Sequence, residues 1–209
     1  MTIIDRLASS LNRRDEAPNT ELARQIAAAG DKKAIAELIR HLADNNKNIR
    51  HDCIKTLYEI GAIRPSLLSG NTGDFIRLLD SNDNRMQWGA MAALLTVTAE
   101  NPGPVFSALP KLAATAEKGS VITRDNYVGI LIQLCGVKSL SEDAFALLNE
   151  QLATCPPNQL PMYAENALPV LLETQRQQFI STLGSRLNDL EKESKRKRLE
   201  KVLKKAVGK

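Results

Sequence analysis

Residues 38–60 read LIRHLADNNKNIRHDCIKTLYEI and contain the pattern that decides the fold. The segment holds two runs of apolar residues at helical spacing, separated by the polar turn Asp44-Asn45-Asn46. Apolar residues that recur every three or four positions predict a helix with one buried face. The sequence therefore predicts two antiparallel helices here, one ending near Ala43 and the other running from about Asn48 to Ile60, closed by Gly61.

The same pattern returns when the chain is shifted by 37 residues, which indicates an internal repeat. Six apolar columns keep their place through three units, and the polar turn falls on Ser81-Asn82-Asp83 in the second. The columns are Leu38, Phe75 and Leu112; Ile39, Ile76 and Ala113; Leu42, Leu79 and Ala116; Ile54, Met91 and Val128; Leu57, Leu94 and Leu131; and Ile60, Val97 and Leu134. Such repetition at one period on one helical face predicts stacked helix pairs.

A fourth, degenerate unit is expected at about residues 143–172. Leu168 and Leu171 continue two of the columns there. Pro156-Pro157 and Pro161 interrupt the unit, and Pro169 is expected to kink its second helix because proline removes a helical N–H and clashes with the preceding turn.

Several residues of the first unit resemble the HEAT repeat. Asp44 in the turn, Ile49-Arg50 at the start of the second helix and Ile60-Gly61 near its end match the family, whose units carry a turn Asp and a Val-Arg pair. The second unit departs with Met86-Gln87, and the third has Thr123-Arg124. The resemblance covers about residues 31–172 and implies an all-α fold, a right-handed α-solenoid of stacked antiparallel helix pairs with a period of about 37 residues. It implies architecture more than activity, because this family includes scaffolds, transport receptors and a few enzymes.

The two ends of the chain are interpreted as caps, because the terminal units of such a stack need polar outer surfaces. Residues 1–30 form the N-terminal cap, with helices expected over Thr2–Leu11 and Thr20–Ala29 and with Thr20 as an N-cap. Gly30-Asp31 separates this cap from about four HEAT-like repeats in residues 31–172. Residues 173–209 are expected to form a C-terminal capping helix and a basic helical tail.

The composition favours a globular, aliphatic helical protein, since 43% of the residues are hydrophobic, 25% are charged and only 4% are aromatic. No stretch approaches the roughly 20 apolar residues that cross a bilayer, so no membrane partner is expected. The N-terminus lacks the apolar run of a signal peptide. Three cysteines without a CxxC pair argue against a disulfide framework or a zinc site, and a cytoplasmic location is expected.

No residue pattern predicts catalysis, a cofactor or a metal site. His41 and His51 are expected on different helices, and no third ligand stands at a suitable spacing. Residues 70–73 lack the Lys-Ser/Thr pair of a phosphate-binding loop. Cys53 and Cys135 lie in or beside the core columns and are interpreted as buried apolar side chains rather than reactive thiols. The sequence thus predicts a protein that is not an enzyme.

The second helix of each repeat lines the concave surface in proteins of this kind, as the resemblance implies. Trp88 is the only tryptophan, and two interpretations of it stay open. It is either an aromatic anchor for a partner, set among the small neighbours Gly89 and Ala92, or it packs into the adjoining unit. The predicted function is a scaffold or adaptor that binds a protein or peptide. The predicted partner-binding residues are Arg50, His51, Lys55, Trp88, Arg124 and Asn126.

The net charge of +4 is concentrated at one end, because residues 192–209 carry +7 and residues 1–191 carry −3. The alternative function is nucleic-acid binding, in which basic side chains contact phosphates. Its residues would be Lys195, Arg196, Lys197, Arg198 and Lys201. Docking on an acidic protein stays open, as does a solvated terminal helix stabilised by pairs such as Glu191–Lys195 and Glu193–Lys197 and by the apolar stripe of Leu199, Val202 and Leu203.

Two analogies give weaker predictions. HEAT-like alkylpurine DNA glycosylases use a comparable solenoid with a basic, aromatic-lined face. One Trp, three Tyr and an acidic body argue against that activity here, because base-flipping enzymes need platforms for the extruded nucleotide. A regulatory or assembly subunit resembling phycobilin lyase subunits is a third possibility, for which the sequence offers no tetrapyrrole motif.

Overall fold

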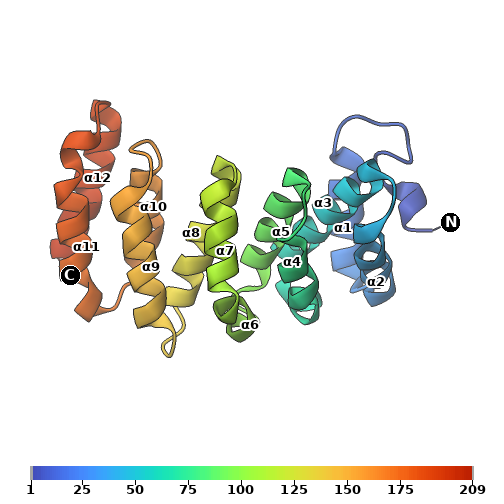
Figure 1. Cartoon of the computed structure of the whole chain (residues 1–209), viewed down its shortest axis with the longest axis horizontal. Helices are drawn as coiled ribbons and strands as arrows, with labels where there is room; N and C mark the ends of the chain where they lie inside the picture. Colours follow the sequence, from blue (N-terminus) through green and yellow to red (C-terminus); the bar gives the residue numbers. More distant parts are fainter. Residues whose placement is uncertain (1, 209) are drawn as a thin grey trace. The chain divides into compact units, whose positions relative to one another are not determined.

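The computed structural model describes residues 2–208, and every regular element in that range is helical (Figure 1). The α-helices are α1 (Ala17–Ala29), α2 (Lys32–Arg40), α3 (Lys47–Ile63), α4 (Thr72–Leu78), α5 (Asn84–Val97), α6 (Pro102–Ser107), α7 (Leu109–Lys118), α8 (Val121–Cys135), α9 (Ser141–Thr154), α10 (Leu160–Ala167), α11 (Glu173–Ser185) and α12 (Glu193–Val207). Short 3-10 helices lie at Ile4–Arg6, His41–Ala43, Pro65–Leu67, Ser69–Asn71, Leu168–Val170 and Leu187–Asp189. The predicted all-α class is confirmed.

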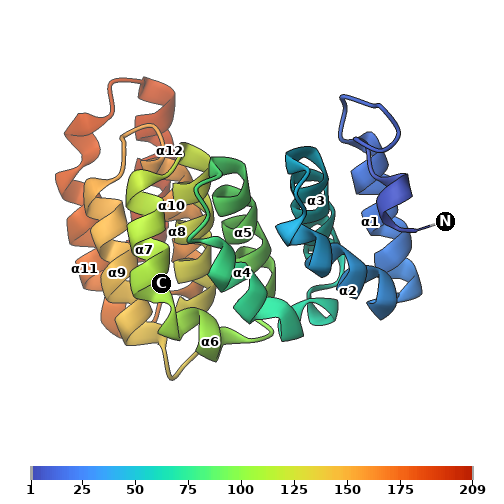
Figure 2. The ribbon, with the colours of Figure 1, turned by 45° about the vertical axis from the view of Figure 1, so that its right-hand side comes forward.

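The chain divides into two compact units, Met1–Tyr127 and Val128–Lys209, and each is described by itself. In the first unit, α3 packs against both α1 and α5, so these three helices form one layer (Figure 2). The first helix of each pair lies against its second helix, α2 on α3 and α4 on α5. We call α1, α3 and α5 the second-helix layer.

Five of the six predicted apolar columns form the core. The columns that begin with Leu38, Leu42, Ile54, Leu57 and Ile60 are buried at all three of their positions. The column that begins with Ile39 is only half-buried throughout. Adjacent residues on a helix point about 100° apart, so this column lies at the edge of the buried stripe whose centre is the neighbouring one. Residues that stand 37 positions apart in these columns are therefore buried to the same degree, and they form the packing surface of each repeat.

A glycine ends α1, and polar side chains cap the starts of the helices that follow the predicted turns. Gly30 has φ = 65° at the end of α1, a left-handed conformation that glycine accepts without strain. Asp31 caps α2 by accepting from two backbone N–H groups at 3.0 Å each. Asn46 caps α3 and Asp83 caps α5 by accepting from one backbone N–H group each, at 3.0 Å. These caps satisfy N–H groups that have no partner within the helix.

A long polar side chain in the first turn of each second helix also reaches back to the turn before it. In the first repeat, Arg50 Nη1 donates to the carbonyl oxygen of Asp44 at 2.7 Å. In the second, Gln87 Nε2 donates to the carbonyl oxygen of Ser81 at 2.8 Å. The two side chains stand 37 residues apart, so they fill one position of the repeat.

Arg124, at the same position of the third repeat, makes this contact with two carbonyl groups. Its Nε donates to the carbonyl oxygen of Ala116 at 3.1 Å, and its Nη2 donates to that of Glu117 at 3.0 Å. The last carbonyls of a helix lack partners within that helix. The column of Arg50, Gln87 and Arg124 therefore bonds the second helix of each pair to the turn before it or to the end of the first helix.

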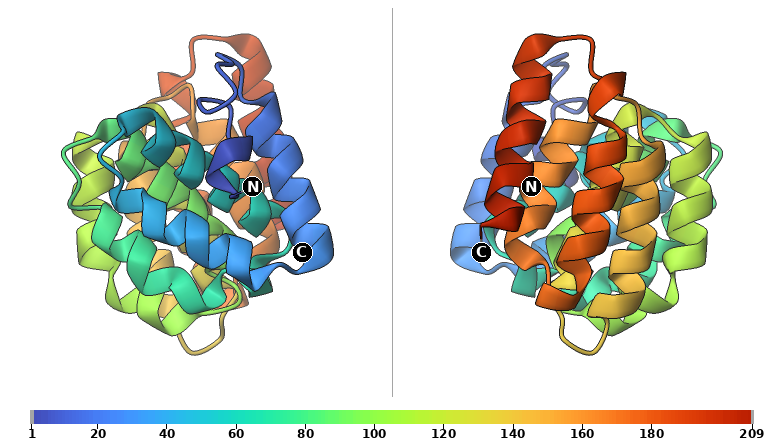
Figure 3. Two further views of the ribbon diagram at one scale, coloured as in Figure 1. Left: turned by 90° about the vertical axis from the view of Figure 1, so that its right-hand side faces the viewer. Right: turned by 90° about the vertical axis from the view of Figure 1, so that its left-hand side faces the viewer.

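The second unit repeats the pairing of helices. There α9 packs against α11, α10 packs against α12, and α11 and α12 also contact each other (Figure 3). Leu199, Val202 and Ala206 of α12 are buried, whereas Leu203 of the predicted stripe is half-buried. The basic segment is therefore a packed helix of the stack.

The prolines of the fourth repeat act differently from the prediction. Pro161 lies in the first turn of α10, where a missing N–H leaves no intrahelical bond unmade, so it helps to start the helix. The predicted kink at Pro169 is wrong, because α10 ends at Ala167 and Pro169 lies in the 3-10 turn that follows. Of the two column residues expected here, Leu171 is buried and Leu168 is half-buried.

The N-terminal segment differs most from the sequence-based expectation. No α-helix spans Thr2–Leu11, where only Ile4–Arg6 forms a 3-10 turn. Thr20 is not an N-cap, since α1 begins three residues earlier at Ala17 with a proline in its first turn. Proline is preferred at this position because its missing N–H would have had no partner there.

Long-range hydrogen bonds determine the path of this segment. Asn19, which is fully buried, accepts from the N–H of Ala8 at 2.9 Å and donates to Asp52 of α3 at 2.7 Å. The other carboxylate oxygen of Asp52 accepts from the N–H of Ser9 at 2.7 Å. These bonds satisfy the N–H groups of Ala8 and Ser9, which a helix over Thr2–Leu11 would have paired locally. Because their acceptors lie far along the chain, no local sequence pattern predicts these bonds.

Gly61 does not close α3, which continues to Ile63. A Cβ atom at this buried position would lie 2.1 Å from Oγ1 and 2.9 Å from Cβ of Thr96 on α5. Gly89 of α5 has the complementary role, since a Cβ there would lie 2.7 Å from Ile54 of α3. Two glycines thus set how closely α3 and α5 approach.

Replacing Gly61 by Ala is expected to lower the free energy of unfolding by about 1–2 kcal/mol, because turning the Thr96 hydroxyl aside does not move its Cβ. Gly184→Ala in α11 is the matched control, since its Cβ would meet nothing within 4 Å. Both changes gain about 1 kcal/mol of helix propensity, but only Gly61→Ala introduces a clash that outweighs this gain. Gly61→Ala should therefore destabilise the protein and Gly184→Ala should stabilise it. Urea unfolding followed by circular dichroism measures both, and a stabilised Gly61→Ala variant would show that this contact is not tight.

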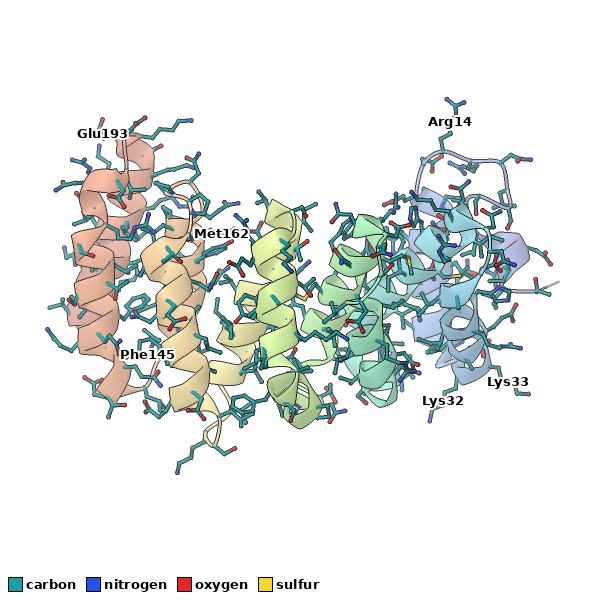
Figure 4. The ribbon with its side chains drawn as sticks, viewed as in Figure 1. Arg14, Lys32, Lys33, Phe145, Met162 and Glu193 are labelled. Atoms are coloured by element: carbon teal, nitrogen blue, oxygen red, sulfur yellow. The ribbon has the colours of Figure 1, made fainter. Side chains whose placement is uncertain are left out.

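Replacing Arg124 by Met keeps the aliphatic stem and removes the donors to the two turn carbonyls. We expect a loss of about 1–2 kcal/mol in unfolding free energy, because the variant lacks two hydrogen bonds that a charged donor makes to carbonyls of α7. Arg14→Met is the control, since Arg14 is exposed at the outer tip of the N-terminal loop (Figure 4). The same unfolding assay serves here, and equal stability of the two variants would contradict a structural role for Arg124.

Candidate functional site

The predicted partner-binding residues of the first two repeats lie on the second-helix layer, on α3 and α5. Arg50, His51, Lys55 and Trp88 are all half-buried, so each combines packing with some exposed surface. Asn126 is half-buried on α8. The structure therefore brings His51, Lys55 and Trp88 to neighbouring helices, but it gives them different surroundings.

Trp88 packs against Tyr58 of α3. The two ring centroids are 5.9 Å apart and the planes are tilted by 50°, a geometry typical of stabilising aromatic pairs. Gly89, expected to be a small neighbour on the outer surface, is instead buried against Ile54. Trp88 therefore packs on the preceding repeat, as one interpretation predicted, and it is only half-buried, so its role as an anchor stays a prediction.

Cations flank the aromatic pair on both sides. Lys55 Nζ lies 4.9 Å from the centre of the Tyr58 ring, and the Arg85 guanidinium lies 5.9 Å from that of Trp88. Such cation–π contacts stabilise the arrangement and fix the rings. The sequence interpretation missed Tyr58 and Arg85, although each stands three residues from a predicted residue on the same helix and hence on the same face.

Glu16, the residue before α1, links the two cations. Its carboxylate forms an ion pair with Arg85, and its second oxygen lies 3.3 Å from Lys55 Nζ. Glu59 also accepts a hydrogen bond from Lys55, at 2.6 Å. We call Glu16, Lys55, Tyr58, Glu59, Arg85 and Trp88 the aromatic cluster. Its two positive charges are matched by two negative ones.

Protonation in the aromatic cluster is set by burial and by these bonds. Burial alone would lower the pKa of Lys55, but hydrogen bonds to Glu59 and Tyr58 outweigh it and raise that pKa. Burial also raises the pKa of Tyr58. At neutral pH the lysine is a cation and the tyrosine is neutral, so the cluster presents fixed charges and ring faces rather than a base.

His51 and Arg50 hold the repeats together. The Nε2 atom of His51 lies 2.8 Å from the carboxylate of Asp83, the residue that caps α5, and only 13% of the His51 side chain is exposed. Arg50 Nη2 lies 3.8 Å from the same carboxylate, and Arg50 also bonds the turn of its own repeat. Arg124 likewise serves a turn. These three predicted binding residues are therefore engaged within the fold.

A polar pocket of about 370 Å³ adjoins the aromatic cluster. Residues of segment 8–16 form one wall, and Asn48, His51, Asp52 and Arg85 form the other. Its buried polar atoms Ser9 Oγ and Arg85 Nε have no hydrogen-bond partner among the described residues. The pocket extends the cluster toward the N-terminal segment and is lined mostly by polar and charged residues.

Most of the predicted nucleic-acid-binding residues on α12 are already bonded. Lys195 donates to the side chain of Asn158 at 2.7 Å rather than pairing with Glu191. Arg196 donates to the carbonyl oxygen of Leu190 at 3.4 Å. Lys197 pairs with Glu193 at 2.6 Å, as predicted.

The last two residues of that set differ from each other. Arg198 donates to both carboxylate oxygens of Glu165, at 2.9 and 2.5 Å, a bidentate pair that fixes its orientation. Lys201 is exposed. The basic segment is thus largely occupied by contacts with its own unit.

Residues 2–208 contain no group of three His, Cys, Asp or Glu side chains arranged to hold a metal ion. Cys53, Cys135 and Cys155 are buried free thiols, and burial raises the pKa of each, that of Cys135 to about 12. Such thiols stay protonated and are poor nucleophiles at neutral pH. Over the same residues, no helix is both long and apolar enough to span a bilayer.

No protein-family model matches the chain, and no curated protein matches it by sequence. Solved structures of repeat proteins do match. A designed armadillo repeat protein in complex with the peptide (KR)4 superposes with a TM-score of 0.67 at 15% identity, over 90% of this chain and 86% of the other. Computationally designed armadillo repeat proteins for modular peptide recognition match with a TM-score of 0.62 at 16% identity, over 98% of both chains.

A third match is the crystal structure of an engineered protein, with a TM-score of 0.60 at 17% identity, over 100% of this chain and 98% of that one. At these identities the similarity concerns the fold. The chain has the fold of an armadillo- or HEAT-like helical repeat protein, an α-solenoid of stacked helix pairs.

Proposed function

We propose that the protein is a non-enzymatic scaffold that binds a protein or peptide on the second-helix layer, with Tyr58 and Trp88 as the anchor. The observation that carries the proposal is the aromatic cluster itself. It combines two half-buried rings with four charged groups on one face of the first unit. Aromatic and charged side chains held in a fixed geometry are typical of residues that dominate binding energy at interfaces.

The solved neighbours support this proposal. Two of them are armadillo repeat designs connected with peptide binding or peptide recognition. Helix pairs that share a continuous core leave an extended surface along their second helices, on which a peptide can lie. The rings are fixed by their packing against each other and by the neighbouring cations, so little conformational entropy is lost when a partner covers them.

Nucleic-acid binding through α12 is the less favoured alternative. The bonds that engage Lys195, Arg196, Lys197 and Arg198 would have to break, or be shared, before those side chains could neutralise phosphates. Residues 1–191 carry a net charge of −3, which would repel the rest of a polyanion.

The test begins with a random peptide library displayed on phage and selected on the immobilised full chain. Affinities of the selected peptides are then measured by fluorescence anisotropy. We expect Trp88→Ala to weaken binding about 30-fold, the size of effect found for interface anchors. Trp88→Phe should retain most of the affinity, because a ring still packs on Tyr58.

Leu172→Ala is the matched control, since Leu172 is an exposed large apolar residue in the other unit. Circular dichroism melts show whether each variant folds. Peptides that bind wild type and folded Trp88→Ala equally would place the binding surface elsewhere and refute this proposal.

A further inference from the structure

The second unit contains a pocket of about 730 Å³ between α12 and the turn that ends α10. It is lined by Leu168 and Pro169 on one side and by Lys201, Lys204 and Lys205 on the other, with Glu165 at its edge. Figure 3 shows α10 and α12 side by side in this unit, and their contacts agree. We call this site the lysine pocket. No residue of the aromatic cluster belongs to it.

The three lysines concentrate positive charge around the pocket. All three are exposed, and they lie within five residues on the last turns of α12. The ion pairs that α12 forms within residues 2–208 involve Lys197 and Arg198 instead. The ammonium groups of Lys201, Lys204 and Lys205 thus face the pocket without a carboxylate within 4 Å in that range.

Glu165 leaves this positive charge largely intact. The hydrogen bonds from Arg198 lower the pKa of Glu165, with smaller contributions from Lys201 and Lys205, so the carboxylate stays ionised. Both of its oxygens are bound by the Arg198 guanidinium. The Glu165 charge is therefore neutralised by an arginine, and the lysines are left for another anion.

The opposite side of the pocket is apolar because α10 ends early. Pro169 cannot continue the helix, and the 3-10 turn Leu168–Val170 leaves Leu168 half-buried and Pro169 exposed beside α12. Apolar surface next to cations suits a ligand that brings both an apolar side chain and negative charge.

We propose that the lysine pocket binds an acidic peptide segment in which an apolar side chain is flanked by carboxylates. The apolar side chain would lie on Leu168 and Pro169, and the carboxylates would pair with the three lysines. A nucleic acid fits less well, because none of the described residues that line the pocket has an aromatic ring for a base to stack on. This site goes beyond the proposed scaffold function, since it is a second surface in the other unit.

The experiment uses the full chain and a fluorescein-labelled peptide, Glu-Leu-Glu-Glu-Leu-Glu, in which each Leu lies between two Glu residues, with its Gln-for-Glu counterpart as the neutral probe. Fluorescence anisotropy gives the dissociation constants. We expect the combined change Lys201→Gln, Lys204→Gln and Lys205→Gln to weaken binding of the acidic peptide about tenfold, from the loss of three exposed ion pairs. The interaction should also weaken as salt is added.

The charge-matched control replaces Lys32, Lys33 and Lys118 of the first unit by Gln. These lysines are exposed, and Figure 4 shows Lys32 and Lys33 pointing away from α2. The control removes the same net charge, so it should bind the acidic peptide like wild type. Trp88→Ala should also bind it like wild type, which separates this site from the scaffold surface.

Glu165→Gln supplies a gain of affinity that a misfolded variant cannot show. It removes the one carboxylate among the described residues that line the pocket and releases Arg198, so we expect the acidic peptide to bind two- to threefold more tightly, a rough figure for one exposed charge. The proposal is overturned if the lysine triple variant binds like wild type, if Glu165→Gln weakens binding, or if the neutral peptide binds equally well. It is also overturned if oligothymidylate or vesicles of anionic lipid bind the same lysines more tightly than the peptide does.

Discussion

Burial of α3 between α1 and α5 is the constraint on which the first unit depends. Leu57 and Ile60 of α3 are inaccessible to solvent, and so are Leu94 and Val97 of α5. A single helix pair has too little apolar surface to bury itself, so each second helix relies on its neighbours in the layer. The helices reach this spacing because Gly61 and Gly89 present no side chain at the closest points.

Polar groups around this core close the backbone at the turns. Arg50 and Gln87 donate to carbonyl groups of the turns, Arg124 donates to carbonyls at the end of α7, and Asp83 joins the cap of α5 to His51. Arg50, His51 and Gln87 lie on the same helices as the aromatic cluster, α3 and α5, yet their bonds are directed into the fold. Residues that resemble a binding surface by charge alone can therefore be structural, because a buried carbonyl needs a donor as much as a ligand does.

The two proposed surfaces differ in their electrostatics. In the aromatic cluster every charge has an opposite partner within the first unit, so rings and shape would dominate recognition. In the lysine pocket Arg198 neutralises Glu165, and three ammonium groups stay available. Interactions of exposed charges are screened by salt, whereas ring packing is not, so binding at the two surfaces should respond differently to ionic strength.

The sequence by itself determined the all-α class, the period of 37 residues and the core columns, because helix periodicity is a local property and burial follows it. It also placed the caps at Gly30-Asp31 and the turn at residues 44–46, where local hydrogen bonding decides the conformation. Of the residues in the aromatic cluster, the sequence interpretation named Trp88 and Lys55 as candidate binding residues but not Tyr58, Arg85 or Glu16.

Only the tertiary structure decided which contacts form between residues that are far apart in the chain. Glu16 meets Arg85 across 69 residues, and Asp52 binds the backbone of Ser9 across 43. The sequence predicted that Gly61 ends its helix, but in the structure a Cβ at this position would clash with Thr96, so Gly61 is part of the α3–α5 interface. The basic segment reads as a tail, yet its buried Leu199 and Val202 and its bond to Glu165 make it a packed helix. Such contacts arise only when helices are stacked, and their energies then outweigh local preference.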